Sequence, residues 1–127
     1  PVQAFLLAIE HGCTTDVARL LQDSQVDPSA NYNAAIQVAS MRGHGKIVKK
    51  LLQDPRVDPA AGDNQAIRVA SMYGHAKVVK KLLKDPRVNP TAWNNEALQL
   101  ANSGGYKKIA KQLKADPRVS DWAYFRG

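Results

Sequence analysis

The amino-acid sequence predicts an all-α solenoid built from four stacked helix–turn–helix repeats. The first observation behind this prediction is that residues 33–59 recur, with few changes, at residues 64–90. The second is that a looser copy begins at residue 95 and another can be aligned with residues 2–28, and a fixed period of about 20–50 residues is typical of stacked arrays. The third is that each copy combines apolar positions at helical spacing with glycine and proline at fixed places. We therefore expect one domain over residues 1–127, with repeats at about 2–32, 33–63, 64–94 and 95–125.

The first helix of each repeat is predicted over about nine residues by apolar columns that match in all four copies. Two of these columns are alanine, and small side chains let neighbouring helices approach closely without leaving a void. An asparagine precedes this helix at Asn33, Asn64 and Asn95, and asparagine is a favourable N-cap because its side-chain oxygen accepts a free backbone N–H. Glycine then ends the helix because it enters the left-handed conformation without a steric penalty. This glycine column consists of Gly12, Gly43, Gly74 and Gly105.

The second helix follows at once, and residues 46–53 illustrate its pattern. Its apolar side chains share one face and are Ile47, Val48, Leu51 and Leu52. The next repeat carries the same stripe over residues 78–83. An Asp-Pro pair, such as Asp54-Pro55, then stops the helix because proline cannot continue it. The valine that comes two residues after each pair is expected to return to the core.

The two ends of the array differ from its middle, as the caps of a solenoid must. Asp16 replaces an isoleucine or valine of the later repeats, and Lys114 and Ala110 replace larger apolar residues of the repeat before. We expect these positions to face water. The aromatic stretch at residues 122–125 is expected to fold back onto the last helix pair.

This order of helix, glycine turn, helix and loop resembles the ankyrin repeat. The resemblance rests on the Ala-Ser-x-x-Gly-His segments at 39–44 and 70–75 and on the Ile/Val-Val-x-x-Leu-Leu segments at 47–52 and 78–83. The period of 31 residues is shorter than the period of about 33 in the family, so plain turns or short hairpins should replace the family's longer loops. What is known of the family implies a non-catalytic module that binds a partner protein through a concave groove.

The positions that vary between otherwise matching repeats are the predicted groove. By the resemblance, they lie at the loop tips and at the exposed end of the first helix. Tyrosine, tryptophan and arginine are common at binding hot spots, methionine adds an adaptable apolar contact, and an exposed tryptophan without a use is unusual. The alternative is ordinary drift at an unconstrained surface. The predicted partner-binding residues are Asn31, Tyr32, Arg42, Asp63, Met72, Tyr73, Trp93 and Asn94.

The second helices are predicted to form a basic face. The formal net charge is +7, and all the lysines lie on these helices opposite the apolar stripe; Arg56, Arg87 and Arg118 are expected to form a further column beside them. The plain interpretation is a solvated surface, and the alternative function is binding of a polyanion, either nucleic acid or anionic lipid. Nucleic acid is disfavoured because Tyr106 is the only aromatic residue near this face. The lysines concerned are Lys46, Lys49, Lys50, Lys77, Lys80, Lys81, Lys84, Lys108 and Lys111.

No pattern in the sequence points to an enzyme, a cofactor or a metal site. His44 and His75 follow the turn glycine and are expected to hydrogen-bond across it, and Cys13 with His11 lacks the further ligands that a metal needs. A single cysteine favours a reducing compartment, the cytoplasm or nucleus, and no apolar run approaches the roughly 20 residues of a membrane span. We expect a monomer whose partner is another protein, acidic in character.

Overall fold

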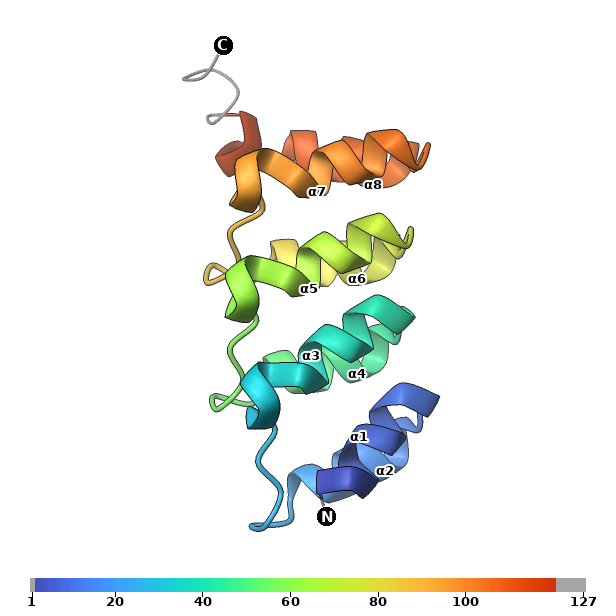
Figure 1. The fold of residues 1–127 in the computed structure, drawn as a ribbon, viewed down its shortest axis with the longest axis vertical. Coiled ribbons are helices and arrows are strands. Elements are labelled where there is room, and N and C mark those ends of the chain that lie inside the picture. The colour runs from blue at the N-terminus through green and yellow to red at the C-terminus, as the bar shows by residue number, and fades with distance from the viewer. Residues whose placement is uncertain (1, 121–127) are drawn as a thin grey trace.

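The computed structural model of the protein describes residues 2–120, which form eight paired α-helices, a further helical turn at residues 117–120 and no strand. The helices pair in chain order, and each pair is followed by a loop to the next pair (Figure 1). The predicted all-α stack of helix pairs is confirmed, with plain turns between the pairs. The helices are α1 (Val2–His11), α2 (Thr14–Leu21), α3 (Ala30–Arg42), α4 (Gly45–Leu52), α5 (Ala61–Met72), α6 (Ala76–Leu83), α7 (Ala92–Ser103) and α8 (Lys107–Ala115).

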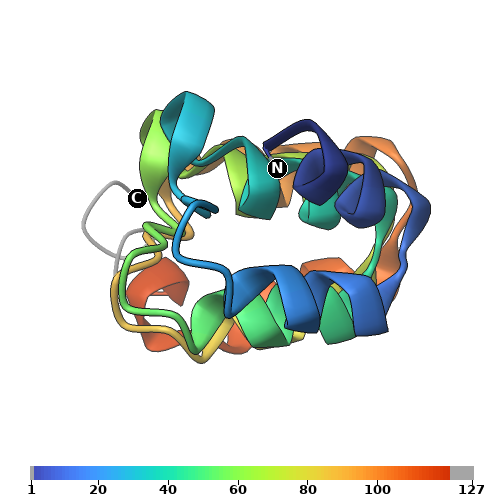
Figure 2. The same ribbon diagram turned by 90° about the horizontal axis from the view of Figure 1, so that it is seen from below.

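The helices lie in two layers, which are seen from the side in Figure 1 and from below in Figure 2. The first helix of each pair packs on the first helix of the next, so that α1, α3, α5 and α7 form one layer, and α2, α4, α6 and α8 form the other in the same way. We call the exposed residues of the first layer and its turns the first-helix face. Those of the second layer form the second-helix face.

The core lies between the two layers and is filled by the apolar columns of the sequence. In α4, Ile47, Val48 and Leu51 are fully buried, and so are their counterparts in α6. Burying each such side chain stabilises the fold by about 1.5–3 kcal/mol. Leu52 and Leu83, predicted as part of the same stripe, are only half-buried and lie at the outer edge of the core.

The ends of the array follow the predicted capping pattern in part. Asp16 and Lys114 are exposed. The expectation that Ala110 faces water is wrong: it is only 7% exposed, because its methyl group continues the apolar stripe of α8 beside Ile109. The predicted position of residues 122–125 lies outside the described residues.

The turn glycines have the predicted left-handed backbone, with φ of +77° at Gly43. The ring of His75, from the next repeat, fills the space above Gly43, so a Cβ there would lie 2.5 Å from its Nδ1. The expectation that His75 bonds across its own turn is wrong, since its Nε2 donates to the carbonyl oxygen of Met41, 2.8 Å away in the preceding repeat. His44 donates to the carbonyl oxygen of Glu10 in the same way, at 3.0 Å. These histidines therefore join neighbouring repeats.

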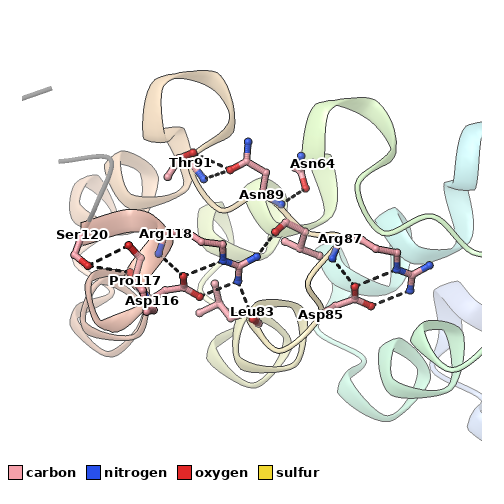
Figure 3. A network of polar contacts seen from close by, with 11 residues as sticks. Asn64, Leu83, Asp85, Arg87, Asn89, Thr91, Asp116, Pro117, Arg118 and Ser120 are labelled. Atoms are coloured by element: carbon pink, nitrogen blue, oxygen red, sulfur yellow. Dashed lines mark hydrogen bonds and ion pairs between the residues drawn. The ribbon is translucent and has the colours of Figure 1, made fainter. Parts of the chain in front are cut away.

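The asparagines before the first helices are not N-caps, which corrects the prediction. Asn33 has a φ of +63°, whereas an N-cap needs an extended backbone. Its Oδ1 accepts a hydrogen bond from the backbone N–H of Asp58 at 2.8 Å. Asn64 accepts one from Asn89 at 2.7 Å (Figure 3). The asparagine thus fixes the loop that leads to the next repeat.

Asn95, the last asparagine of this column, lacks that partner. Its Oδ1 is buried without a hydrogen bond within the part of the chain that the structure describes. The N–H that would bind it belongs to Ser120 and instead donates to the carbonyl oxygen of Asp116 in a short helical turn. In earlier repeats a proline such as Pro59 follows the loop residue and disfavours helix there. Asp121 stands at that position in the last repeat and removes the restriction.

The arginine after each Asp-Pro pair ties neighbouring repeats together. Arg87 contacts both carboxylate oxygens of Asp85, at 3.1 and 2.8 Å (Figure 3). Its Nη1 also donates to the carbonyl oxygen of Val57 at 2.8 Å. Arg56 and Arg118 repeat this arrangement. The hydrogen bonds from Arg87 hold the pKa of Asp85 below its usual value. The three arginines thus recur at equivalent positions, as predicted, but they add no free positive charge, because each guanidinium is paired with a carboxylate.

Candidate functional site

The predicted groove residues are all exposed, but the structure places them in two separate rows. One row follows the turns where the first helices begin, and the other follows the C-terminal ends of the same helices. The rows are about 13 Å apart, because about nine helical residues at about 1.5 Å each separate them. The turn row consists of Asn31, Tyr32, Asp63, Trp93 and Asn94, and the end row of Arg42, Met72 and Tyr73.

The turn row stands on left-handed backbone. At residues 31–33, 62–64 and 93–95 every φ lies between +54° and +66°. This conformation costs about 1–2 kcal/mol for each residue other than glycine. Such strain persists only where neighbouring contacts hold it, and it is concentrated at functional sites in known proteins.

A side chain from the following helical turn holds each left-handed segment. Gln37 donates from Nε2 to the carbonyl oxygen of Tyr32 at 3.0 Å. Gln99 makes the same bond to the carbonyl oxygen of Asn94 at 2.6 Å. Arg68 holds the middle segment through its Nε and Nη2. Each strained segment thus has at least one of its carbonyl groups bound by a side chain of the helix that follows it.

Trp93 is the most strongly anchored member of the turn row. The guanidinium carbon of Arg68 lies 4.1 Å from the centroid of its ring, a distance typical of a cation–π contact. The indole Nε1 donates to Oδ2 of Asp63 at 3.4 Å, and Arg68 also pairs with Glu96 at 3.1 Å. Despite these contacts Trp93 remains 58% exposed. The ring is therefore oriented by the protein while a large part of it stays open to a partner.

The other large exposed side chains lie on the same face. Tyr32 is 90% exposed, and Tyr73 and Met72 are about half exposed. The exception is Leu7, which is exposed on α1 but lies beside Ala8 and Leu20 in a hollow at the N-terminal end of the stack. Sequence reasoning missed one contributor to this face, Arg68, which supports Trp93. Arg68 stands in a column that is glutamine in the repeats on either side, at Gln37 and Gln99, and that variation was a usable signal.

The second-helix face carries the unpaired positive charge of the molecule. Each ion pair within residues 2–120 is made by an arginine, so none of the lysines there has an acidic partner. Lys50 and Lys81 are half-buried. The other predicted lysines are exposed, and these are Lys46, Lys49, Lys77, Lys80, Lys84, Lys108 and Lys111.

Shallow hollows lie between neighbouring second helices, and we call them the leucine hollows. The hollow between α4 and α6 holds about 260 Å³ and is lined by Lys49, Leu52, Gln53, Lys81 and Lys84. The hollow between α6 and α8 holds about 430 Å³ and has Leu83 in the place of Leu52. A third hollow, between α2 and α4, has Leu21 in this place. The basic face is therefore not uniform but has a half-buried leucine at regular intervals.

The described residues offer no arrangement that would bind a metal ion, because no three His, Cys, Asp or Glu side chains come together there. Cys13 is an exposed free thiol, and His11 is exposed as well. No helix within residues 2–120 combines the length and the apolar character needed to cross a membrane.

Comparison with protein families gives one match, to the model of ankyrin repeats in three copies, over residues 37–121. This range includes α4 to α8 and residues 37–42 of α3. Comparisons with curated proteins and with solved structures gave no match.

Proposed function

The chain belongs to the ankyrin-repeat family, and we propose that it binds a partner protein through its first-helix face. Ankyrin repeats generally mediate protein–protein interactions, and the family is typically non-catalytic. The groove expected from the resemblance corresponds here to the turn row and the end row. The intracellular location, the monomeric state and the boundaries of the four repeats stay predictions.

The orientation of Trp93 is the observation that carries this proposal. Its ring is fixed by Arg68 and Asp63 and is still more than half exposed. Binding a side chain that is already ordered costs less conformational entropy, so such a residue contributes more affinity. Tryptophan and tyrosine are also the residue types most enriched at binding hot spots.

The charges of the first-helix face indicate what kind of partner it fits. Arg42 pairs with Glu10 at 3.1 Å, and Arg68 pairs with Glu96 at the same distance. These charges therefore balance, and large aromatic side chains remain between them. We propose that this face recognises an apolar or aromatic segment of the partner, while any preference for acidic partners arises on the second-helix face.

Replacing either Trp93 or Tyr73 by alanine should weaken partner binding by about 30-fold, because we propose that each is a hot spot worth about 2 kcal/mol. The measurement is the affinity for a protein captured by the wild-type chain, before and after the two substitutions. Gln22→Ala, an exposed residue of the opposite layer, is the matched control and should change nothing. Unchanged affinity in both Trp93→Ala and Tyr73→Ala would remove the first-helix face as the binding site.

A second candidate function is binding of a polyanion through the second-helix face, favoured by the absence of acidic partners for its lysines. Heparin is a suitable probe, and its affinity should fall steeply as salt rises, since bound lysines release counterions. Replacing Lys46, Lys77 and Lys108 by glutamate should weaken heparin binding by about tenfold or more. These residues lie in the first turns of their helices, where glutamate suits the helix dipole, so the fold should not suffer.

The matched control for this experiment is Arg42→Glu, which reverses one charge on the first-helix face. It should leave heparin binding nearly unchanged. Heparin affinity that is independent of salt, or equal in the lysine variant and the wild type, would mean that these lysines only solvate the surface.

A further inference from the structure

The leucine hollows repeat at one register along the second-helix face. Leu21, Leu52 and Leu83 occupy equivalent places, each between one second helix and the next. Their side chains are half-buried and pack against the core. A ligand therefore meets an apolar floor at each hollow and not only a lattice of positive charge.

The lysines concentrate around two of these hollows. The hollow of Leu52 is lined by Lys49, Lys81 and Lys84, and the hollow of Leu83 is lined by Lys80, Lys84 and Lys108. The one carboxylate in the lining of the second, that of Asp116, is bound by Arg118 and does not neutralise the lysines. The hollow of Leu21, by contrast, has Lys50 as its lysine. The two hollows from α4 to α8 thus combine an apolar floor with a rim of positive charge.

The shape of these hollows distinguishes between anionic ligands. Phosphate groups of nucleic acid or of lipid head groups would reach the lysines but would leave the leucine floors facing water. A partner whose apolar side chains protrude among carboxylates would fill the floors and pair with the rims at once. Each buried methylene contributes about 0.8 kcal/mol, so the apolar contact adds affinity that a phosphate ligand lacks. The observations therefore favour an acidic protein segment.

The interval between the hollows indicates the conformation of that segment. Neighbouring packed helices are about 8–10 Å apart, so successive hollows lie about 10 Å apart. Residues i and i+7 of an α-helix are separated by about 10.5 Å and share one face. In an extended strand about 10 Å corresponds to three residues, which point to opposite faces. A helix running along the row of repeats can fill both hollows, whereas a strand cannot.

From this match we infer that the second-helix face is a docking surface for an acidic amphipathic helix of a partner protein. Apolar side chains at i and i+7 of that helix occupy the hollows of Leu52 and Leu83, and flanking glutamates or aspartates pair with the surrounding lysines. This inference rests on the second proposed function, because it names the class of anion that the lysine face takes. It is independent of the first-helix face.

The inference is tested with two synthetic peptides of about 20 residues, long enough to form a helix. Both are rich in glutamate and alanine and have the same composition. One has leucine at i and i+7, and the other has leucine at i and i+5, which lie on different sides of a helix. The first should bind the wild-type chain about tenfold more tightly than the second by fluorescence anisotropy. Equal affinities, or no binding of either peptide, would overturn the inference.

A variant with Leu52→Gln and Leu83→Gln provides the second arm. This variant should bind the i, i+7 peptide about tenfold more weakly than the wild type does. Its affinity for heparin should stay as in the wild type, since heparin contacts only the lysines. Circular dichroism checks that this variant is folded, and the two-peptide comparison on the wild type needs no variant. Tighter binding of duplex DNA or of anionic vesicles than of the peptide, with no effect of the leucine changes, would identify nucleic acid or lipid as the ligand and overturn the inference. If the wild-type chain itself did not bind heparin, the lysine face would instead be removed as a polyanion site.

Discussion

Replacing Gly43 by alanine should lower the free energy of unfolding by about 2–5 kcal/mol, because two separate costs add. The first is the left-handed backbone, with φ of +77°, which costs a residue with a Cβ about 1–2 kcal/mol. The second is the ring of His75, which lies 2.5 Å from where that Cβ would be. Overpacking of this kind costs about 1–3 kcal/mol. Urea denaturation followed by circular dichroism measures the loss.

Gly105 is the matched control for this substitution. Its φ of +74° is nearly that of Gly43, but no atom of residues 2–120 lies within 4 Å of a Cβ built there. Gly105→Ala should therefore show only the backbone cost. Similar losses at the two glycines would mean that the histidine ring moves aside at little cost. In a double-mutant cycle, the loss of stability in the Gly43→Ala, His75→Ala double variant should be smaller than the sum of the two single losses. The clash with the ring is absent once His75 is replaced.

The contact between Gly43 and His75 also shows what a repeating sequence does and does not reveal. Alignment of the repeats was enough to predict the glycine turn, because left-handed backbone is a local property of the chain. It could not show that the histidine column lies over the glycine column of the preceding repeat. That contact depends on how two successive repeats pack against each other in space. The spacing of residues within one repeat does not give this packing distance.

The asparagine column failed as a predicted N-cap for a related reason. Local propensity favours asparagine at an N-cap, and nothing local favours three successive left-handed residues at a cost of about 1–2 kcal/mol each. The strain is offset by contacts made after folding, such as the bond from Gln37 to Tyr32 and the bond from Asp58 to Asn33. Local sequence rules could not weigh these contacts against the propensity.

For the candidate site, the exposed residues could be predicted from the sequence, but the side chains that contact and support them within the molecule could not. The exposure of Trp93 followed from its variable column. Its support by Arg68 and Asp63 links the start of α7 to α5, and this contact became visible only in the structure. The lysine face could be predicted because the three second helices at residues 45–53, 76–84 and 107–115 contain all the lysines and no aspartate or glutamate. The ion pair of Arg87 was not predicted, although Asp85 stands two residues before it and could have suggested one.

Replacing Arg87 by alanine should destabilise the fold by about 2 kcal/mol at neutral pH. The change removes the hydrogen bonds to the carbonyl oxygen of Val57, in the preceding repeat, and to Asp85. It leaves the Asp85 carboxylate, whose side chain is only 12% exposed, without its cation, and an unpaired and largely buried charge costs more than a lost surface pair. Arg19→Ala, which breaks a pair at 3.5 Å between two well-exposed side chains, should change stability by less than about 0.5 kcal/mol.

The pH dependence of the Arg87→Ala effect separates the ion pair from the bond to Val57. The pKa of Asp85 is lowered in the folded protein, first by the hydrogen bonds from Arg87. A lowered carboxyl pKa contributes stability that is present above the unfolded value of about 3.9 and is lost as the pH falls through the folded value. The difference between wild type and variant should therefore be constant from about pH 7 to about pH 5 and shrink below about pH 4. A difference that does not change with pH down to the acid limit would mean that Arg87 acts through Val57 alone, because only the carboxylate titrates in this range.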